Sequence, residues 1–361
     1  MDNLEVQSFA DIDLNDSFFD SLRRNYPNFD HWFKQKAAEG RRAYVFYDSN
    51  HKLLDFLSLK NEEEKIELEN STLPKKRRLK VSTFKIISRD TTRGERFIKK
   101  ILDKAIADGV EEVYVTMFDD EEELKALRHL FERYGFVFKG YKVSDEKRKE
   151  GVFIRDMLAF TGDILKDYPK VDISERPKYL ISIYPKYHTR LFSDSMLTNE
   201  HYDILEDTSE INGIFKTYIC WMPDVYLLNP GDKIIIYRTN DGKGSAYYRS
   251  VATSLCTVVE VKTNRDFADK EQFKKYCKYS VFENSDLERW YESSRICYVI
   301  KMLYNVAFRR RVIRKELIEN AGIPANLYWG FFRLTDNQFN RILKLGQIDE
   351  RYIINQAKIC R

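Results

Sequence analysis

Residues 80–136 constrain the fold more than any other stretch of this sequence. An apolar run opens the stretch, and a turn that contains Arg93 and Gly94 follows it. An amphipathic segment at 97–106 comes next, then a second apolar run at 113–118 and a second amphipathic segment. Apolar residues that alternate predict strands, and apolar residues three and four positions apart predict helices. The stretch therefore predicts a strand, a helix, a strand and a helix in succession.

The turn between the first strand and the first helix is a candidate anion site. The first N–H groups of a helix lack partners within it, and the helix dipole attracts negative charge to them. Gly94 admits a ligand close to the backbone because it has no side chain. Arg93 and Arg96 add positive charge that suits a pyrophosphate.

This order of elements and two short motifs resemble the acyl-CoA core of the GNAT N-acetyltransferases. In the usual pattern Gln/Arg-x-x-Gly-x-Gly/Ala, Gly94 matches the first glycine, whereas Thr91 and Arg96 depart from the pattern. Residues 130–136 are similar to Phe-Tyr-Glu-Lys-x-Gly-Phe, with Phe131 where a tyrosine often protonates the leaving thiolate. The resemblance covers residues 1–162 and implies an α/β (α+β) domain with a mixed central sheet flanked by helices.

The resemblance implies acetyl-CoA (CoA) as the cofactor and direct acetyl transfer to an amine. The implied cofactor-binding residues are Ile86, Ser88, Arg93, Gly94, Glu95, Arg96 and Phe97. Tyr134 is the candidate acid, because it lies three residues after Phe131 and so faces the same side of a helix. Glu62 is the candidate that accepts the proton of the amine. Packing in the core for Tyr134 and solvated charge for Glu62 are the open alternatives.

The N-terminal aromatic residues have two interpretations. Phe18, Phe19 and Leu22 fall at helical spacing, and Trp32 and Phe33 follow on a second predicted helix. Amphipathic aromatic stripes usually face a core, which here is the sheet. In the GNAT fold the corresponding helices also border the acceptor cleft, so the resemblance implies that both interpretations can hold.

The length of 361 residues predicts two domains. We expect a first domain at 1–162, a linker at 163–178 with two prolines and no periodicity, and a second domain at 179–361. Charged residues make up 33% of the chain, but they nearly balance at a net charge of +4. That balance does not itself predict nucleic-acid binding, for which a local basic patch would be needed.

Three segments of the second half resemble PUA-like domains of the ASCH and EVE groups. They are residues 179–192, the Pro-Gly-Asp segment at 229–238 and residues 330–343. The resemblance implies a small β-barrel with helical insertions that binds RNA or modified bases.

Basic and aromatic residues of the second half make that binding physically feasible, because they supply phosphate donors and stacking planes. The candidate nucleic-acid-binding residues are Trp221, Tyr237, Arg238, Arg249, Arg309, Arg310 and Arg311. A tyrosine-rich core with solvated arginines is the alternative, because strands favour aromatic residues. His188 is expected to be a satisfied core or surface histidine rather than a pocket residue.

The cysteines and the hydropathy of the chain indicate the cellular environment of the protein. The five cysteines form no Cys-x-x-Cys pair and have no histidine at metal-ligand spacing, which predicts reduced thiols and no metal. No apolar run reaches the roughly 20 residues that span a bilayer. We therefore expect a cytoplasmic protein without a membrane partner. A homo-oligomer remains open.

Two functions follow from the sequence. In the first, an N-acetyltransferase modifies an amine that the RNA-binding second domain delivers, for example on charged tRNA as in acetyltransferase toxins. In the second, the GNAT fold is catalytically silent and serves a nucleic-acid-binding, regulatory or defence module. The motif departures at Thr91, Arg96 and Phe131 favour the second.

Overall fold

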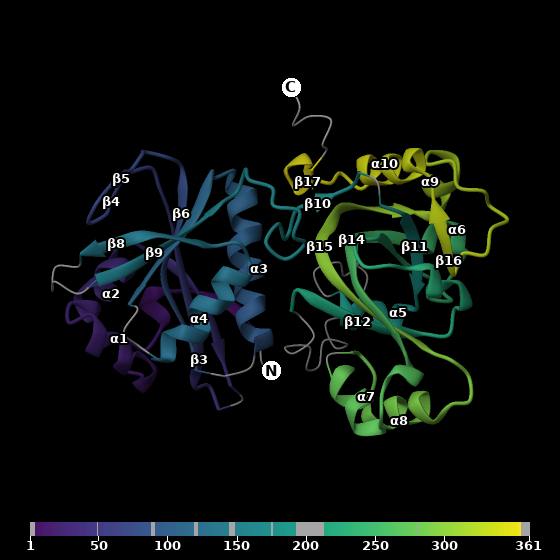
Figure 1. Cartoon of the computed structure of the whole chain (residues 1–361), viewed down its shortest axis with the longest axis horizontal. Coiled ribbons are helices and arrows are strands. Elements are labelled where there is room, and N and C mark those ends of the chain that lie inside the picture. The colour runs from purple at the N-terminus through teal and green to yellow at the C-terminus, as the bar shows by residue number, and fades with distance from the viewer. Residues whose placement is uncertain are drawn as a thin grey trace. The chain divides into compact units, whose positions relative to one another are not determined.

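The chain folds into two compact units, residues Met1–Asp167 and Tyr168–Arg361. The computed structural model describes residues 4–48, 50–87, 91–118, 122–143, 149–174, 176–192, 213–278 and 280–354. The main sheet of the first unit has seven strands, and that of the second has six (Figure 1). The predicted fold class, α/β with helices around a mixed sheet and a second β-rich unit, is confirmed.

The first unit is organised around one mixed sheet with the order β1-β2-β3-β6-β7-β9-β8. Its strands are β1 (Leu4–Ser8), β2 (Arg42–Tyr47), β3 (Leu53–Glu62), β6 (Arg78–Ile86), β7 (Glu112–Phe118), β9 (Lys149–Asp156) and β8 (Val137–Val143). Neighbours are antiparallel except for β6 and β7, which run parallel. Parallel neighbours need a crossover connection, and helix α3 (Thr91–Asp108) supplies it. A small hairpin of β4 (Ile66–Glu67) and β5 (Thr72–Leu73) follows β3.

Different helices cover the two faces of this sheet. Successive side chains of a strand point to opposite faces, so neighbouring residues of β6 identify the helices on each side. Lys85 donates a hydrogen bond of 2.6 Å to Ser21, at the start of α1 (Asp20–Asn25), which α2 (Phe29–Ala38) follows. Phe84 points the other way, and its ring lies 5.4 Å from that of Phe97 in α3. The ring of Phe131 in α4 (Glu122–Arg133) lies 5.8 Å from Phe84. Helices α1 and α2 therefore cover one face, and α3 and α4 cover the other.

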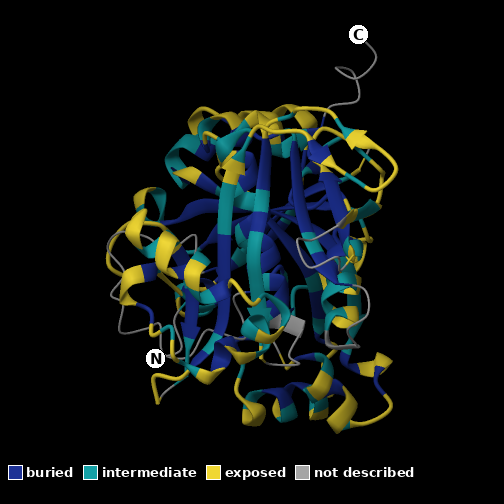
Figure 2. Cartoon of the chain, turned by 90° about the vertical axis from the view of Figure 1, so that its left-hand side faces the viewer, coloured by how far each residue is buried: buried dark blue, intermediate teal, exposed yellow. Residues whose placement is uncertain are grey.

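Burial in the first unit follows these layers. Figure 2 shows buried strands behind helices whose outer surfaces are exposed. The predicted aromatic residues of the N-terminal helices form a core on the α1–α2 face with Phe56 of β3. Phe18, Phe19 and Phe33 are fully or almost fully buried there, whereas Trp32 is only partly buried. The interpretation that these residues pack on the sheet is confirmed for the phenylalanines.

The second unit has a six-stranded sheet with the order β12-β15-β14-β13-β11-β16. Its strands are β12 (Phe215–Cys220), β15 (Tyr298–Ile313), β14 (Val251–Thr263), β13 (Lys233–Arg238), β11 (Lys178–Ile183) and β16 (Phe331–Leu334). Its helices are α5 (Pro185–Leu191), α6 (Ala246–Arg249), α7 (Lys270–Tyr276), α8 (Asn284–Glu292), α9 (Arg314–Glu319) and α10 (Asp336–Leu345). No pairing among the described residues closes this sheet into a barrel, so the closed barrel stays a prediction.

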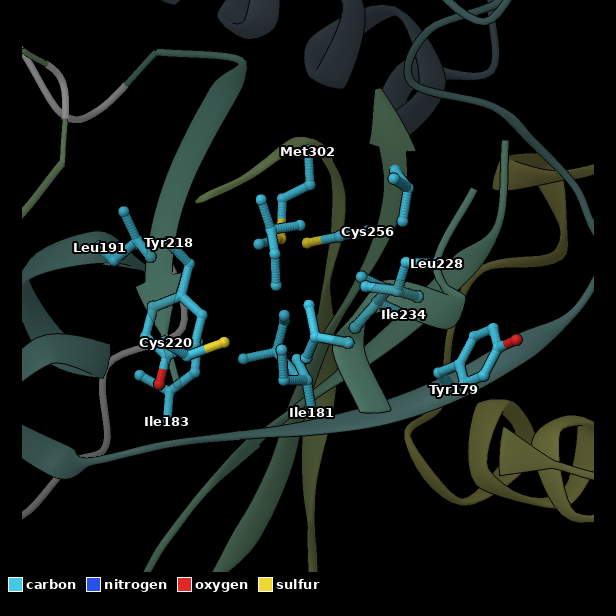
Figure 3. Packing of buried hydrophobic residues seen from close by; sticks show 14 of the residues in the cluster. Tyr179, Ile181, Ile183, Leu191, Tyr218, Cys220, Leu228, Ile234, Cys256 and Met302 are labelled. Atoms are coloured by element: carbon cyan, nitrogen blue, oxygen red, sulfur yellow. The ribbon is translucent and has the colours of Figure 1, made fainter. Parts of the chain in front are cut away.

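Both faces of the central strands in this sheet are buried. Ile181 and Ile234 enter one core, which Figure 3 shows from close by. Leu180 and Ile235 enter a second core with residues of α10. Alternate side chains thus reach different cores, and this is why β11 and β13 read as continuous apolar runs.

The predicted linker at 163–178 is packed rather than free. Asp167 is buried and accepts hydrogen bonds from the N–H groups of Thr161 and Gly162 at 2.9 Å. Tyr168 is also buried, and its hydroxyl donates to the carbonyl of Tyr304 at 3.1 Å. Strand β10 (Val171–Asp172) pairs with β17 (Ile353–Ile354). The apolar residues Tyr168, Val171 and Ile173 of this segment pack within the second unit, and its role as a linker between two domains stays a prediction.

Across the described residues, no helix combines the length and the apolar character that crossing a membrane requires.

Gly135 provides a test of the packing after α4. Its φ is +84°, and a Cβ atom there would lie 2.7 Å from the carbonyl oxygen of Lys166. Gly135→Ala should lower the free energy of unfolding by roughly 2–4 kcal/mol in urea denaturation, because backbone strain and a backbone clash add. Gly40→Ala is the matched control, because Gly40 has φ +64° with open space around it. Its cost should be only about 1 kcal/mol, and equal costs for both variants would contradict the packing argument.

Candidate functional site

Strands β6 and β7 separate partway along their length. Only residues Arg78–Val81 of β6 pair with Glu112–Val115 of β7, although both strands continue beyond these residues. The cause lies in β6, where Ser82 is an extra residue between two positions paired with β3. Such a β-bulge bends its strand and increases the local twist. The bulge therefore turns β6 away from β7 directly after their last pair.

Backbone groups of β6 face the gap that this separation opens. The N–H of Ile87 bonds to the carbonyl of Leu54 at 3.0 Å, so Ile87 faces β3. Backbone direction alternates along a strand, so the N–H and C=O of Ile86 and Phe84 face the opposite way, toward β7. Among the described residues no strand pairs with them on that side.

A cleft of about 280 Å³ lies at this gap. Its residues come from both faces of the sheet, because α1 and α2 border it on one side and α4 on the other. The helical lining is Leu22, Asn25, Tyr26, Asn28, Phe29, Trp32, Leu124 and Leu127, and the strand lining is Val81, Ser82, Thr83, Phe84, Val115, Thr116, Met117 and Phe118. None of these described lining residues carries a formal charge. The gap is thus an apolar passage edged by polar backbone groups.

The start of α3 adjoins the end of β6. The helix begins at Thr91, five residues after β6 ends at Ile86. The first four N–H groups of a helix have no acceptor within it, and they carry the positive end of the helix dipole. Ile86, Arg93 and Gly94 of the predicted cofactor site are therefore close to this end of the strand. The predicted contact Ser88 lies outside the described residues.

Three other predicted cofactor contacts, Glu95, Arg96 and Phe97, are not among the residues at the start of α3 whose N–H groups lack a partner within the helix. The helix begins at Thr91, earlier than the motif suggested. Glu95, Arg96 and Phe97 lie beyond the first four residues of α3, so their N–H groups bond to carbonyls within the helix. Glu95 is buried and pairs with Arg133 at 3.1 Å, and Phe97 is buried in the core. The side chains of Glu95 and Phe97 thus contribute to the packing of the fold, and a contact of these three residues with the cofactor stays a prediction.

Gly94 also has a packing role that the sequence did not reveal. A Cβ atom at Gly94 would lie 2.7 Å from Cδ2 of Leu130 in α4. The missing side chain therefore makes room for Leu130 rather than leaving open space above the turn.

Arg93 is turned toward the sheet. Its Nη1 lies 3.4 Å from Oδ2 of Asp55, and its guanidinium lies 5.2 Å from the ring centre of Phe46. Asp55 is fully buried, and neither of its oxygens accepts a hydrogen bond from another side chain. Burial raises the pKa of Asp55 to about 6, against the opposing effects of Arg93, the Ile87 backbone and Arg96. The charge predicted to bind phosphate is thus shared with a buried carboxylate.

Tyr134 does not occupy the position expected of an acid. It is fully buried and is not among the residues that line the cleft. Burial, and then the neighbouring charge of Glu95, raises the pKa of its hydroxyl well above the usual value. The end of α4 carries the ring of Tyr134 into the core, where its hydroxyl lies away from the cleft lining, and its role as the acid stays a prediction.

Glu62 lies at the far end of β3, opposite Arg78, where β6 and β7 are still paired. It accepts a hydrogen bond from the hydroxyl of Tyr114 and one from Lys60 at 3.2 Å. Burial acts to raise the pKa of Glu62, but Tyr114, Lys80 and Lys60 together lower it. Glu62 is therefore held as a carboxylate, and it is not among the residues that line the cleft.

The aromatic residues predicted to bind nucleic acid are engaged within the second unit. The ring of Trp221 stacks on Trp290 with centroids 3.8 Å apart. Tyr237 is buried, with its ring 5.3 Å from that of Trp329. His188 is buried and within 2.8 Å of the Thr253 hydroxyl, and burial lowers its pKa to about 3. His188 is therefore a core histidine, but it is satisfied only at Nε2, because its buried Nδ1 has no hydrogen-bond partner among the described residues.

The predicted arginines do not form one free basic patch. Arg249 pairs with Asp241, Arg309 with Asp349 at 2.9 Å, and Arg310 with Glu316. Arg311 donates to the carbonyl of Phe308, and Arg238 is buried. The sequence showed the cluster of positive charge but not which acceptors it meets, and one of them, Asp349, lies 40 positions from its partner Arg309.

Sequence reasoning missed most of the cleft. Leu124 and Leu127 are three residues apart on α4, and this spacing is a usable signal for one helix face. The polar strand residues Ser82, Thr83 and Thr116 give no such signal, because the bulge that exposes them depends on pairing with β3.

Comparison with known proteins finds relatives of two kinds among solved structures. Neither a family model nor a curated protein matches the sequence. The chain is similar to the ASCH protein from Zymomonas mobilis, with 12% identity, a TM-score of 0.32, and coverage of 46% of this chain and 94% of that one. It is also similar to a GNAT-family acetyltransferase from Staphylococcus aureus Mu50, with 11% identity, a TM-score of 0.30, and coverage of 43% and 99%. A putative phosphinothricin N-acetyltransferase matches with 18% identity, a TM-score of 0.30, and coverage of 43% and 98%.

Structures of both kinds that the sequence resembles thus match the chain, each over somewhat less than half of it. All three TM-scores are below 0.5. The inferences below therefore rest on the cleft and not on the matches.

The burial of Asp55 predicts how the stability of the protein depends on pH. A carboxyl whose pKa is raised in the folded chain binds its proton more tightly there than in the unfolded chain, so its contribution to stability falls as the pH rises from about 4 to about 6. The free energy of unfolding of Asp55→Asn, relative to that of the natural chain, should therefore rise by roughly 2–3 kcal/mol between pH 4 and pH 8. Urea denaturation of both proteins at the two pH values measures this. A stability difference that does not change with pH would contradict the assignment.

Proposed function

We propose that the first unit binds acetyl-CoA at the cleft and transfers the acetyl group to an amine. The observation that carries this proposal is the separation of β6 and β7, which leaves backbone groups of Phe84 and Ile86 facing an apolar passage. An extended chain with amide groups, such as the pantetheine arm, can bond to such a strand edge as an added strand would. The N-terminus of α3 beside the same strand end suits the phosphates.

The two faces of the cleft suit two reactants. Phosphates at α3 place the cofactor on the α3–α4 face, so the amine enters from the α1–α2 face. When bound, acetyl-CoA would supply a thioester whose C–S bond breaks as the amine nitrogen forms the C–N bond. The leaving thiolate would then be protonated through solvent, which balances the proton that the amine passes to Glu62. The protein orients the two reactants and excludes water, and this positioning is a large part of catalysis.

Glu62 remains the proposed acceptor of the amine's proton in a path that passes Tyr114. Tyr114 lies two residues before the cleft residue Thr116 on β7, so both side chains point to the same face. The hydroxyl of Tyr114 donates to Glu62, and burial together with this carboxylate raises the pKa of Tyr114. Tyr114 therefore stays neutral and can connect the cleft with the carboxylate.

Blocking the cleft tests the proposal. Leu127→Trp should abolish acetyl-CoA binding or weaken it at least about tenfold in calorimetry, because Leu127 lines the cleft from α4 and the larger ring fills the side proposed for the cofactor. Thr72→Trp is the matched control, because Thr72 is exposed on the β4–β5 hairpin. Urea denaturation checks that both variants are folded. If the natural protein does not bind acetyl-CoA at millimolar concentration, the proposed function is wrong.

We also propose that the second unit binds RNA and brings the acceptor to the first unit. Exposed tyrosines favour this, since they offer planes on which bases stack. Tyr184 follows β11, Tyr328 precedes β16, and they are 65% and 72% exposed. The N–H of Ser182 bonds to the carbonyl of Gly330 at 2.8 Å, which continues the antiparallel register and sets the two tyrosines opposite each other.

Filter binding with single-stranded RNA and duplex DNA tests this second role. The double change Tyr184→Ala and Tyr328→Ala should weaken RNA binding about tenfold or more, because stacking contributes roughly 1–3 kcal/mol per base. The double change Arg309→Ala and Arg311→Ala tests the arginines predicted from the sequence. If they contact phosphates, the slope of log affinity against log salt should fall by roughly 0.7 for each arginine. Binding unchanged in both double variants would exclude these two surfaces.

A further inference from the structure

The α1–α2 side of the cleft has an aromatic wall, and this wall bears on the identity of the acceptor. Tyr26 lies beside Phe118 with ring centroids 5.2 Å apart, and Phe29 lies beside Trp32 at 5.6 Å. All four residues line the cleft. Tyr26 and Trp32 are only partly buried, so part of their ring surface is available to a ligand.

The polar groups on this side are neutral. Asn25 and Asn28 supply side-chain amides, one at the end of α1 and one just before α2. Amides orient a ligand through hydrogen bonds but do not neutralise a cation. Lys85, a charged residue on this face of β6, bonds instead to Ser21 and to the carbonyl of Phe18.

We infer that the acceptor is an amine carried by an aromatic or bulky apolar group, with no second positive charge beside it. This inference rests on the proposed acetyl transfer and specifies its substrate class. An aromatic ring that leaves water for this wall gains from the burial of apolar surface and from ring–ring contact. A polyamine or a lysine side chain would lose hydration without gaining an opposite charge among the described lining residues.

The chemistry of the amine points the same way. Only the neutral amine can attack the thioester, and the described lining residues include no carboxylate or histidine that could take its proton directly. An α-amine, with a pKa near 8, is partly neutral at physiological pH, whereas a lysine amine with a pKa near 10.4 is almost wholly charged. The α-amine of an aromatic or large aliphatic amino-acid unit meets both requirements.

Three amino-acid amides test this inference, because they present the same α-amine on different side chains. Phenylalaninamide should exceed alaninamide in kcat/KM by at least about tenfold, since burial of a phenyl ring contributes on the scale of a tenfold effect or more. Lysinamide should be no better than alaninamide. Equal rates for the three amides, or a preference for lysinamide, would overturn the inference.

Variants of the wall localise the effect. Trp32→Ala and Tyr26→Ala should each reduce the preference for phenylalaninamide over alaninamide, measured as the ratio of their kcat/KM values, at least about threefold. Phe138→Ala is the matched control, because Phe138 is an exposed aromatic residue of β8 that is absent from the cleft lining. A ratio that is unchanged in both wall variants would contradict the inference.

Two measurements separate this inference from the function on which it rests. Calorimetry with acetyl-CoA reports cofactor binding alone, so its failure counts against the proposed function. If acetyl-CoA binds but no amide is acetylated, equilibrium binding of the three amides to the protein saturated with CoA decides the inference. Tighter binding of phenylalaninamide that is lost in Trp32→Ala supports the aromatic subsite, and equal binding of all three overturns it.

Discussion

The separation of β6 from β7 is the constraint on which the first unit's site depends. Ser82 is an additional residue in β6 that shifts its register against β3, and β6 and β7 separate after Val81. Backbone amides without partners are costly in a protein interior, on the order of 1–3 kcal/mol each. A strand edge of this kind is stable where water or a ligand can reach it, and the cleft supplies that access.

The sheet tolerates this gap because each of the two strands is held on its other side. β6 pairs with β3 from Arg78 to Ile86, and β7 pairs with β9 over all its residues. Helices lie on both faces of the sheet (Figure 1), and the cleft lies where β6 and β7 separate. The opening is therefore a fixed part of the fold, and it joins two chemically different sides. The α3–α4 side has a helix N-terminus, and the α1–α2 side has an aromatic wall.

Buried charge lies beside the proposed phosphate end of this site. Arg93 sits in the first turn of α3 but is turned toward Asp55, whose carboxylate is fully buried. Were a phosphate to draw Arg93 outward, Asp55 would lose its main neutralising partner, so the proposal links phosphate binding to the protonation of Asp55. In the second unit, Arg309 and Arg310 also form ion pairs with acidic residues, Asp349 and Glu316.

The sequence by itself determined the features that depend on local periodicity. The alternation and helical spacing between residues 80 and 136 correctly predicted β6, α3, β7 and α4. The N-terminal aromatic stripe indicated helices on the sheet. These signals are carried by residues a few positions apart, so a linear pattern contains them.

Only the tertiary structure decided which of these groups are buried. Glu95 and Phe97 lie beyond the first turn of a helix that starts at Thr91, and Tyr134 follows the end of α4, so all three side chains are buried. The partners of Arg93 and Arg309 lie 38 and 40 positions away, and the bulge at Ser82 depends on its register with β3. Contacts between residues so far apart follow from the packing of whole elements, and no local sequence pattern specifies them.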